Sequence, residues 1–247
     1  MAPPRVQVGP LVVDCFRCDR LAACRHYISQ GNGAAEPAIL FVGQNPGDQE
    51  DMDKQGRPFI GLAGQLAKYL CEAADVPRAD VRWVNAVRCH SPSNAKPTTT
   101  EVENCHDYLL DEITATHPGC IVALGETAFH SLYLLPRHRQ ALHRYEQGAL
   151  ADWQRECQRI QALTDHAVAD WEASVLNWQA AGGKKGTGEA KPLKPKPQTK
   201  PKVPKKPVKE KMSMTSVAGV TLFQPETGIP LIDTYHPSWI MRGKWDK

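Results

Sequence analysis

Short apolar runs alternate with amphipathic segments along much of the chain. Four runs have the β-branched and aromatic character of buried strands. They are Ala38–Val42, Arg82–Val87, Cys120–Leu124 and Pro230–Tyr235. Leu62–Cys71 spaces its apolar residues on one helix face, and Thr100–Ile113 does so after a capping hydroxyl and an acidic first turn. Alternating strands and helices predict an α/β fold, with a parallel sheet covered on both faces.

The fourth strand is separated from the third by a long insertion. Residues 136–181 are charged and contain tryptophan, and their apolar positions roughly follow one helical stripe. One helix of this length would extend about 60 Å, so a helical hairpin broken near Gly148 is the alternative. We expect an amphipathic helix that packs its tryptophan face on the protein body. A helix that binds a partner is the other interpretation.

A Lys/Pro-rich segment, residues 182–211, follows the insertion. Eleven lysines and two glutamates between Lys184 and Lys211 give it a net charge of +9, which leaves −6 elsewhere in a chain of net charge +3. Such a segment cannot bury a core, so we predict a disordered or polyproline-like linker. Residues 184–211 then either contact nucleic acid or another polyanion, or only keep the protein in solution. The predicted α/β domain comprises residues 1–135 and 212–247.

Length and composition narrow the class of protein. The 247 residues suit one α/β domain with an insertion, and no apolar run is long enough to span a bilayer. Residues 1–5 lack the apolar core of a signal peptide. We therefore expect a soluble, intracellular protein without membrane association. We further expect it to be a monomer in the cytoplasm, either nucleoid-associated or phage-encoded in a bacterial cytoplasm. Eight cysteines in such a chain indicate metal binding or burial rather than disulfides.

The segment Gly43–Asp51 is the most informative part of the chain. It reads Gly-Gln-Asn-Pro-Gly-Asp-Gln-Glu-Asp and directly follows the first apolar run. Pro46 restricts the residue before it to extended conformations, and Gly47 leaves room for another group to approach. Ligands of open α/β sheets bind at the carboxyl ends of strands, so this polar turn is a candidate site.

Four cysteines have the spacing of metal ligands. Cys15 and Cys18 form a C-x-x-C pair, Cys89 follows the second predicted strand, and Cys105 lies on the next helix. Four thiolates of this kind can bind a cubane iron–sulfur cluster or a tetrahedral zinc ion, and the residues alone do not separate the two. The remaining cysteines are expected to be small buried residues. They are Cys24, Cys71, Cys120 and Cys157.

Taken in order, the motifs resemble the family-4, iron–sulfur-containing uracil-DNA glycosylases over about residues 12–132 and 213–242. The motifs are Cys15-x-x-Cys18 with Leu21 and Arg25, Gly43–Asp51, Gly56-Arg-Pro-Phe-Ile-Gly61 with Ala63-Gly64, Asn85-Ala-Val-Arg-Cys89, Pro97 with Glu101 and Cys105, Ala123-Leu-Gly125, and Thr234-Tyr-His-Pro-Ser238.

The resemblance implies a three-layer α/β/α fold with a four-stranded parallel central sheet and an active site at the strand ends. It also implies a structural 4Fe–4S cluster on Cys15, Cys18, Cys89 and Cys105. The activity implied is base excision repair by a monofunctional DNA glycosylase, which hydrolyses the N-glycosidic bond of deoxyuridine in single- or double-stranded DNA without a catalytic metal.

Particular residues match the roles that this chemistry requires. A glycosylase extrudes its base into a closed pocket, where Phe59 is the matching residue for stacking on it. The amide of Asn85 can both donate and accept, as O4 and N3–H of uracil require. His236 matches the donor that stabilises charge developing at uracil O2. Ser238 is expected to contact phosphate or to support the turn.

Asn45 occupies the position that a water-activating residue takes in related families. An amide cannot act as a general base, but it can orient water, so we expect slower hydrolysis than with a carboxylate. Gly43, Gln44, Gly47 and Glu50 are predicted to line the same pocket.

Two features depart from the family-4 pattern. Gln44 and Asn45 replace the usual residues of the first motif, and the loop from Asp51 to Gly56 is about two residues longer. Asn45 with Gly47 suggests some activity on 5-substituted or mismatched pyrimidines. One alternative is a weak or inactive family member that binds DNA containing uracil or a modified pyrimidine. Another is a zinc-dependent interaction module, which would explain the cysteines but not the His-Pro-Ser turn.

Overall fold

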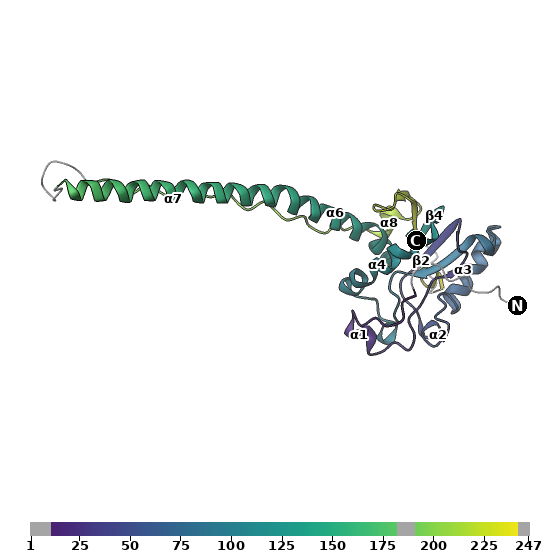
Figure 1. Cartoon of the computed structure of the whole chain (residues 1–247). Coiled ribbons are helices and arrows are strands. Elements are labelled where there is room, and N and C mark those ends of the chain that lie inside the picture. The colour runs from purple at the N-terminus through teal and green to yellow at the C-terminus, as the bar shows by residue number, and fades with distance from the viewer. Residues whose placement is uncertain (1–10, 182–190, 242–247) are drawn as a thin grey trace. The chain divides into compact units, whose positions relative to one another are not determined.

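The computed structural model describes residues 11–181 and 191–241, and it divides into two compact units (Figure 1). Unit 1 comprises residues up to 138 and from 209 onward, and unit 2 comprises residues 139–208. The domain limits expected from the sequence, 135/136 and 211/212, lie three residues from these divisions. Each unit is described below by itself.

The described part of unit 1 contains one six-stranded sheet of order β1-β3-β2-β4-β6-β5. Its strands are β1 (Asn32–Gly33), β2 (Ile39–Gly43), β3 (Val81–Asn85), β4 (Cys120–Leu124), β5 (Thr221–Phe223) and β6 (Pro230–Thr234). The four central strands are parallel and correspond to the four predicted runs, with ends shifted by at most two residues. The antiparallel edge strands β1 and β5 were not predicted, because two or three residues show no periodicity.

Helices connect the strands. The α-helices are α1 (Asp19–Ala22), α2 (Asp48–Asp51), α3 (Leu62–Ala73), α4 (Thr99–Thr116), α5 (Glu126–Phe129), α6 (Leu135–Tyr145), α7 (Ala151–Ala180), α8 (Met214–Val217) and α9 (Pro237–Met241). Shorter 3₁₀ or π-helical turns are η1 (Arg78–Asp80), η2 (Pro92–Asn94), η3 (His130–Leu134) and η4 (Glu146–Leu150).

Both helices expected within the α/β domain form, but α4 begins earlier than predicted. Its N-cap is Thr98 rather than Thr100, because Thr98 and Glu101 form a reciprocal capping box. Thr98 Oγ1 accepts from the Glu101 N–H at 3.3 Å, and Glu101 Oε2 accepts from the Thr98 N–H at 2.7 Å.

Helices cover both faces of the sheet. On one face, Leu40 of β2 and Ile121 of β4 are fully buried in a cluster with Leu109 and Ile113 of α4. On the other face, Trp83 of β3 packs in a cluster with residues of α3 such as Ala67. This arrangement confirms the predicted α/β/α architecture and places the strand ends between the two helical layers.

A buried ionic triad ties β3 to α4. Glu112 accepts from Arg82 Nε at 2.6 Å and from Arg88 Nη2 at 2.9 Å, and all three side chains are at most 3% exposed. Arg82 also donates to the carbonyl oxygens of Gly33 and Ala34. Because removal of one partner would leave an uncompensated buried charge, the triad holds the end of β3 at a fixed position against α4.

Unit 2 is built on one continuous helical segment. The chain passes from α6 through the π-helical turn η4, which contains Gly148, directly into α7. The alternative of a hairpin broken near Gly148 is therefore wrong. Residues 191–208 form neither helix nor strand, and residues 182–190 of the predicted linker lie outside the described part. Within the described chain, no helix combines the length and apolar character that crossing a bilayer requires.

Candidate active site

The predicted site residues lie at the carboxyl ends of the four parallel strands. Gly43 ends β2 opposite Asn85 at the end of β3. Leu124 of β4 pairs with Thr234 of β6, so the residues that follow these two strands begin at the same edge. The topology therefore brings together segments that are up to 190 residues apart in sequence.

Phe59 and Asn85 converge over the Cα atom of Gly43. A Cβ atom on Gly43 would lie 2.5 Å from Phe59 Cζ and 2.6 Å from Asn85 Oδ1. Asn85 is 4% exposed, and its amide makes no side-chain hydrogen bond to any residue the structure describes. An aromatic ring and an unused amide thus meet at one point, and only glycine at position 43 leaves space there.

The backbone of Phe59 is held in an unusual conformation. Its φ angle is +59°, and its ring packs against Trp83 with a centroid distance of 5.0 Å. A Cβ on Gly64 would lie only 2.2 Å from the Phe59 carbonyl oxygen, so α3 packs directly on this turn. Lys68 Nζ donates to the same oxygen at 2.7 Å, and burial lowers the pKa of Lys68. The ring orientation is therefore fixed by its surroundings.

Gln44 and Asn45 form a short hydrogen-bonded chain. Gln44 Nε2 donates to Asn45 Oδ1 at 2.9 Å, and Thr127 Oγ1 donates to Gln44 Oε1 at 3.1 Å. Asn45 Nδ2 lies 3.2 Å from the Pro46 carbonyl oxygen and 3.5 Å from Ser91 Oγ. Gln44 thus fixes the orientation of the Asn45 amide, with the Asn45 oxygen accepting and its nitrogen donating.

Glu50 fills the space beside Gly47. A Cβ on Gly47 would lie 3.0 Å from Glu50 Oε2, and Glu50 Oε1 accepts from the Gly61 N–H at 2.7 Å. The carboxylate of Glu50 therefore links the first motif to the turn that carries Phe59.

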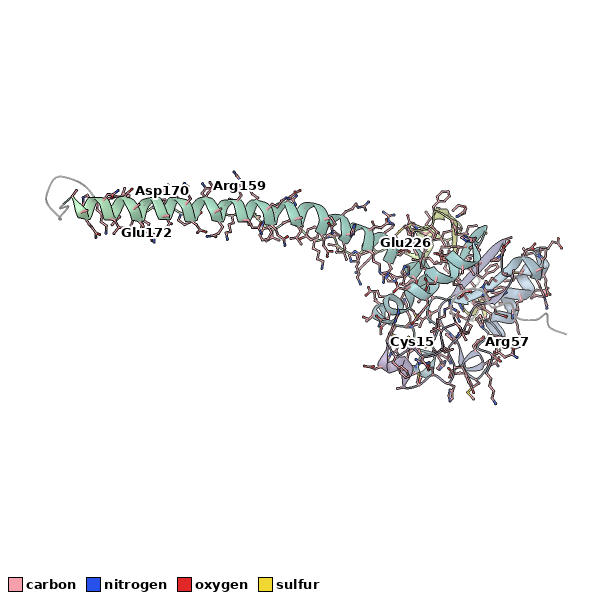
Figure 2. All side chains as sticks on the ribbon, in the orientation of Figure 1. Cys15, Arg57, Arg159, Asp170, Glu172 and Glu226 are labelled. Carbon is pink, nitrogen blue, oxygen red and sulfur yellow. The ribbon has the colours of Figure 1, made fainter. Side chains whose placement is uncertain are left out.

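The loop beyond Asp51 is closed by its own contacts. Arg57, labelled in Figure 2, donates to the Asp53 carboxylate through Nε at 3.0 Å and Nη2 at 2.9 Å. Burial acts to raise the pKa of Asp53, but these hydrogen bonds outweigh it and the pKa is lowered. Asp51 is 3% exposed and accepts from the His26 N–H at 2.9 Å. The loop is thus anchored at both ends.

His236 has a defined tautomer. The Ser238 N–H donates to His236 Nδ1 at 3.2 Å, and Ser238 Oγ lies 2.8 Å from the same atom. Because a backbone N–H can only donate, Nδ1 is an acceptor and the ring proton of the neutral imidazole is on Nε2. Gly125, with φ of +90°, lies against this histidine, and a Cβ there would be 3.1 Å from His236 Cβ.

The four predicted cysteine ligands gather beside the end of β3. Cys89 and Cys105, each 5% exposed, lie in one small cluster against which Cys18 packs. Cys15, labelled in Figure 2, is hydrogen-bonded to the Tyr108 side chain, and this bond raises the pKa of Tyr108.

Several N–H groups point at these sulfur atoms. Asn104 Nδ2 donates to Cys18 Sγ at 3.4 Å, the Arg88 N–H to Cys105 Sγ at 3.5 Å, and Arg25 Nη1 to Cys89 Sγ at 3.6 Å. Burial raises the pKa of Cys89 to about 12 and that of Cys105 to about 11. Thiolates here need a positive partner, and the N–H donors suit sulfur that carries negative charge.

Within the described residues, no three His, Cys, Asp or Glu side chains are placed for one metal ion. In a cubane cluster each of the four thiolates binds a different iron, so the sulfur atoms of such a site need not converge on one point. The other four cysteines are half-buried, not fully buried as expected.

Sequence reasoning missed several residues that support the site. Thr127 of α5 donates to Gln44, and Ser91 in the loop after β3 lies beside Asn45. Lys68 of α3 donates to the carbonyl oxygen of Phe59. No sequence signal identified them, because each acts through a partner distant in the chain. A cavity of about 340 Å³ contains none of the predicted site residues, since it lies near the amino end of β4, lined by Ile113, Thr114, His117, Pro118, Thr227 and Ile229.

The model of the uracil DNA glycosylase superfamily matches residues 30–247, which is most of the chain. The chain belongs to this superfamily. The glycosylase match begins after Cys15 and Cys18, so these two cysteines are outside it.

Curated members of the superfamily are similar to part of the chain. The Type-4 uracil-DNA glycosylase of Thermotoga maritima is 40% identical over 121 residues, which is 49% of this chain and 62% of the relative. That of Archaeoglobus fulgidus is 36% identical over 124 residues, 50% of this chain and 61% of the relative. That of Pyrobaculum aerophilum is 38% identical over 115 residues, 47% of this chain and 57% of the relative. The matched stretch therefore spans about three fifths of these relatives.

Proposed function

We propose that this protein is a uracil-DNA glycosylase that hydrolyses the N-glycosidic bond of deoxyuridine in DNA. The observation that carries the proposal is the meeting of Phe59 and Asn85 over Gly43. An extruded uracil needs an aromatic surface for its ring and an amide for its Watson–Crick edge, and both are supplied at this point. Similarity to Type-4 uracil-DNA glycosylases supports the same substrate.

His236 is proposed to stabilise the leaving base. When the N1–C1′ bond breaks, the electron pair stays on uracil, and negative charge develops on its O2. The neutral His236 presents Nε2–H as a donor, because Nδ1 is occupied by Ser238. Water then adds to C1′, and its released proton neutralises the uracil anion. A fixed donor at a developing charge accounts for roughly 100-fold to 1,000-fold in rate.

Asn45 is proposed to orient the attacking water. Its side chain is held by Gln44 and Pro46, so it can position a water molecule. Because an amide is not a base, it cannot remove a proton from that water. Hydrolysis therefore depends mainly on stabilisation of the leaving base, and we expect a modest rate.

Glu50 is proposed to restrict the pocket on the side of the base 5-position, since its carboxylate lies against Gly47. This favours uracil, whereas Gly47 with Asn45 allows some excision of 5-substituted or mismatched pyrimidines. Comparing duplexes with U:G, T:G and 5-hydroxymethyluracil measures the balance, and strict uracil specificity would contradict the second part.

Cys15, Cys18, Cys89 and Cys105 are proposed to bind a 4Fe–4S cluster. The cluster would supply a structural cross-link, because it would connect the segment before α1 with the end of β3 and with α4. The donors from Arg25, Arg88 and Asn104 would compensate the charge on the sulfur atoms.

The proposed activity is tested by single-turnover excision from uracil-containing single- and double-stranded DNA. His236→Asn should lower the rate by roughly 100-fold or more, and Asn45→Ala should lower it to a smaller extent. If neither substitution lowers excision, the assigned site is wrong.

A second candidate function is binding of uracil-containing DNA without turnover. The observation that favours it is Asn45, because an amide at this position cannot act as a general base on the attacking water. Tight, uracil-dependent binding with no excision under single-turnover conditions would establish this second function and exclude the first.

A further inference from the structure

The Lys/Pro-rich segment has a period of three residues. Between residues 191 and 208, five of six consecutive triplets have proline at their central position, and four begin with lysine. These prolines are Pro192, Pro195, Pro201, Pro204 and Pro207. A polyproline II helix has three residues per turn, so this period places the prolines along one edge and the lysines along the other two.

Exposure follows the same period. Pro192, Pro195, Pro204 and Pro207 are half-buried, whereas every lysine from Lys191 to Lys206 is exposed. The proline edge of the segment therefore faces the rest of unit 2, and the lysine edges are exposed, although Lys194 Nζ also lies 5.5 Å from the centroid of the Trp171 ring.

Aromatic side chains of the long helix hold the proline edge. Tyr145 Oη donates to the carbonyl oxygen of Pro204 at 3.0 Å. Trp153 Nε1 donates to that of Pro201 at 2.9 Å, and Trp171 Nε1 to that of Pro192 at 2.9 Å. The partners run in opposite order, so the segment returns antiparallel along α7 (Figure 1). We call these three contacts the aromatic latch. Trp153 and Trp171 of the stripe thus pack on this segment, whereas the sequence predicted packing of the tryptophan face on the protein body.

The two elements match in length. From Tyr145 to Trp171 an α-helix rises about 39 Å. From Pro192 to Pro204 a polyproline II helix rises about 37 Å. An α-helical segment between the same two prolines would rise only about 18 Å, so the latch requires an extended chain such as a polyproline II helix.

The lysines of this segment are not neutralised within the described chain. None of the seven from Lys191 to Lys206 forms an ion pair with a described residue, whereas Lys209, just beyond, pairs with Glu103. On α7, Arg155 pairs with Asp152 and Arg159 with Glu156, so these acids are already compensated (Figure 2 labels Arg159). Rows of unpaired ammonium groups on an ordered support can bind an external polyanion.

We propose that unit 2 is a DNA-binding arm in which the aromatic latch orders the Lys/Pro-rich segment and presents its two lysine rows to the phosphate backbone. The choice of DNA as the polyanion rests on the proposed function. Ordering the segment before it binds reduces the entropy lost on binding, so the latch strengthens phosphate contact without making any itself.

The test measures the affinity of the full chain for an undamaged DNA duplex over a range of salt concentrations. Combined Lys196→Gln, Lys200→Gln and Lys206→Gln should weaken binding at least tenfold. It should also reduce the salt slope by about 2 to 3, because each phosphate contact contributes about 0.9. The matched control places the same three glutamines at Leu193, Val203 and Val208, which are exposed and uncharged, and it should behave as wild type.

A second variant tests the latch. Combined Tyr145→Phe, Trp153→Phe and Trp171→Phe removes the three donors but no charge, so affinity should fall several-fold with an unchanged salt slope. Trypsin should cleave faster after Lys202 and Lys205, which do not precede proline. Circular dichroism should show that the helix is retained.

Three results would overturn the inference. The first is a lysine variant whose salt slope equals that of its control. The second is a latch variant with the affinity and the trypsin cleavage rate of wild type. The third is competition by polyglutamate that equals competition by DNA of the same charge. The binding assay needs no uracil, so a protein that binds in this way but does not excise contradicts only the proposed function. A protein that excises uracil with a lysine-independent slope contradicts only this inference.

Discussion

Gly43 and Asn85 lie opposite each other at the ends of β2 and β3, and a Cβ atom on Gly43 would lie 2.6 Å from Asn85 Oδ1. Gly43→Ala must therefore displace Asn85 or Phe59, which lies equally close. Overpacking of this kind costs about 1 to 3 kcal/mol. We expect uracil excision to fall at least tenfold while the protein remains folded, as measured by single-turnover kinetics and thermal unfolding.

Gly148→Ala is the control for this substitution. A Cβ at Gly148 meets no atom within 4 Å, and the residue lies inside a helical segment. It should leave excision unchanged and slightly stabilise the helix. Equal excision by the two variants would contradict the proposed pocket.

Ser238→Ala should impair excision less than His236→Asn. The substitution removes the hydroxyl beside His236 Nδ1, but the backbone N–H of residue 238 still donates to that atom. Loss of one such hydrogen bond is worth about 1 kcal/mol, so we expect a rate decrease of roughly fivefold. A rate as low as that of His236→Asn would show that Ser238 has a direct role, for example at a phosphate.

Cys89→Ser should abolish cluster binding, because Cys89 is a buried member of the proposed donor set. The purified protein should lose bound iron and its broad absorption at about 400 nm. Cys71→Ser, which changes a half-buried cysteine of α3, should keep both. A colourless wild-type protein that contains zinc would contradict the cluster assignment.

Asp233 should make stability depend on pH. It is fully buried on β6, no residue in the described part of the chain forms a hydrogen bond of normal geometry with its carboxyl oxygens, and burial raises its pKa to about 7. Since its ordinary pKa is 3.8, the folded state holds a proton that the unfolded state releases. Stability should thus fall as pH rises from about 4 to about 7, by up to roughly 4 kcal/mol.

Asp233→Asn should remove this pH dependence and be more stable than wild type above pH 7 or so. Urea unfolding at a series of pH values measures the free energy of unfolding of both proteins. Contributions from other carboxylates are common to the two proteins and cancel in the difference. Parallel curves for wild type and Asp233→Asn would contradict the prediction.

Local patterns in the sequence determined much of the fold. Short apolar runs predicted the four parallel strands. Periodicity predicted α3, α4 and the helical character of the insertion, because side-chain spacing decides which face of a helix is apolar. The start of α4 was misplaced by two residues, since three successive threonines follow Pro97 and only Thr98 has its reciprocal partner Glu101. The resemblance to a family named the site residues but could not show how their side chains are held.

Only the tertiary structure decided the contacts between distant segments. Asn85 faces Gly43 because β2 and β3 are neighbours in register, and Glu112 joins Arg82 to Arg88 because α4 lies across β3. The triplet repeat of residues 191–208 is present in the sequence, but its fit to the aromatic stripe depends on an extended segment running antiparallel to a helix of smaller rise per residue. Short-range sterics determine an element from its own residues, whereas such pairings depend on which elements the complete chain brings together.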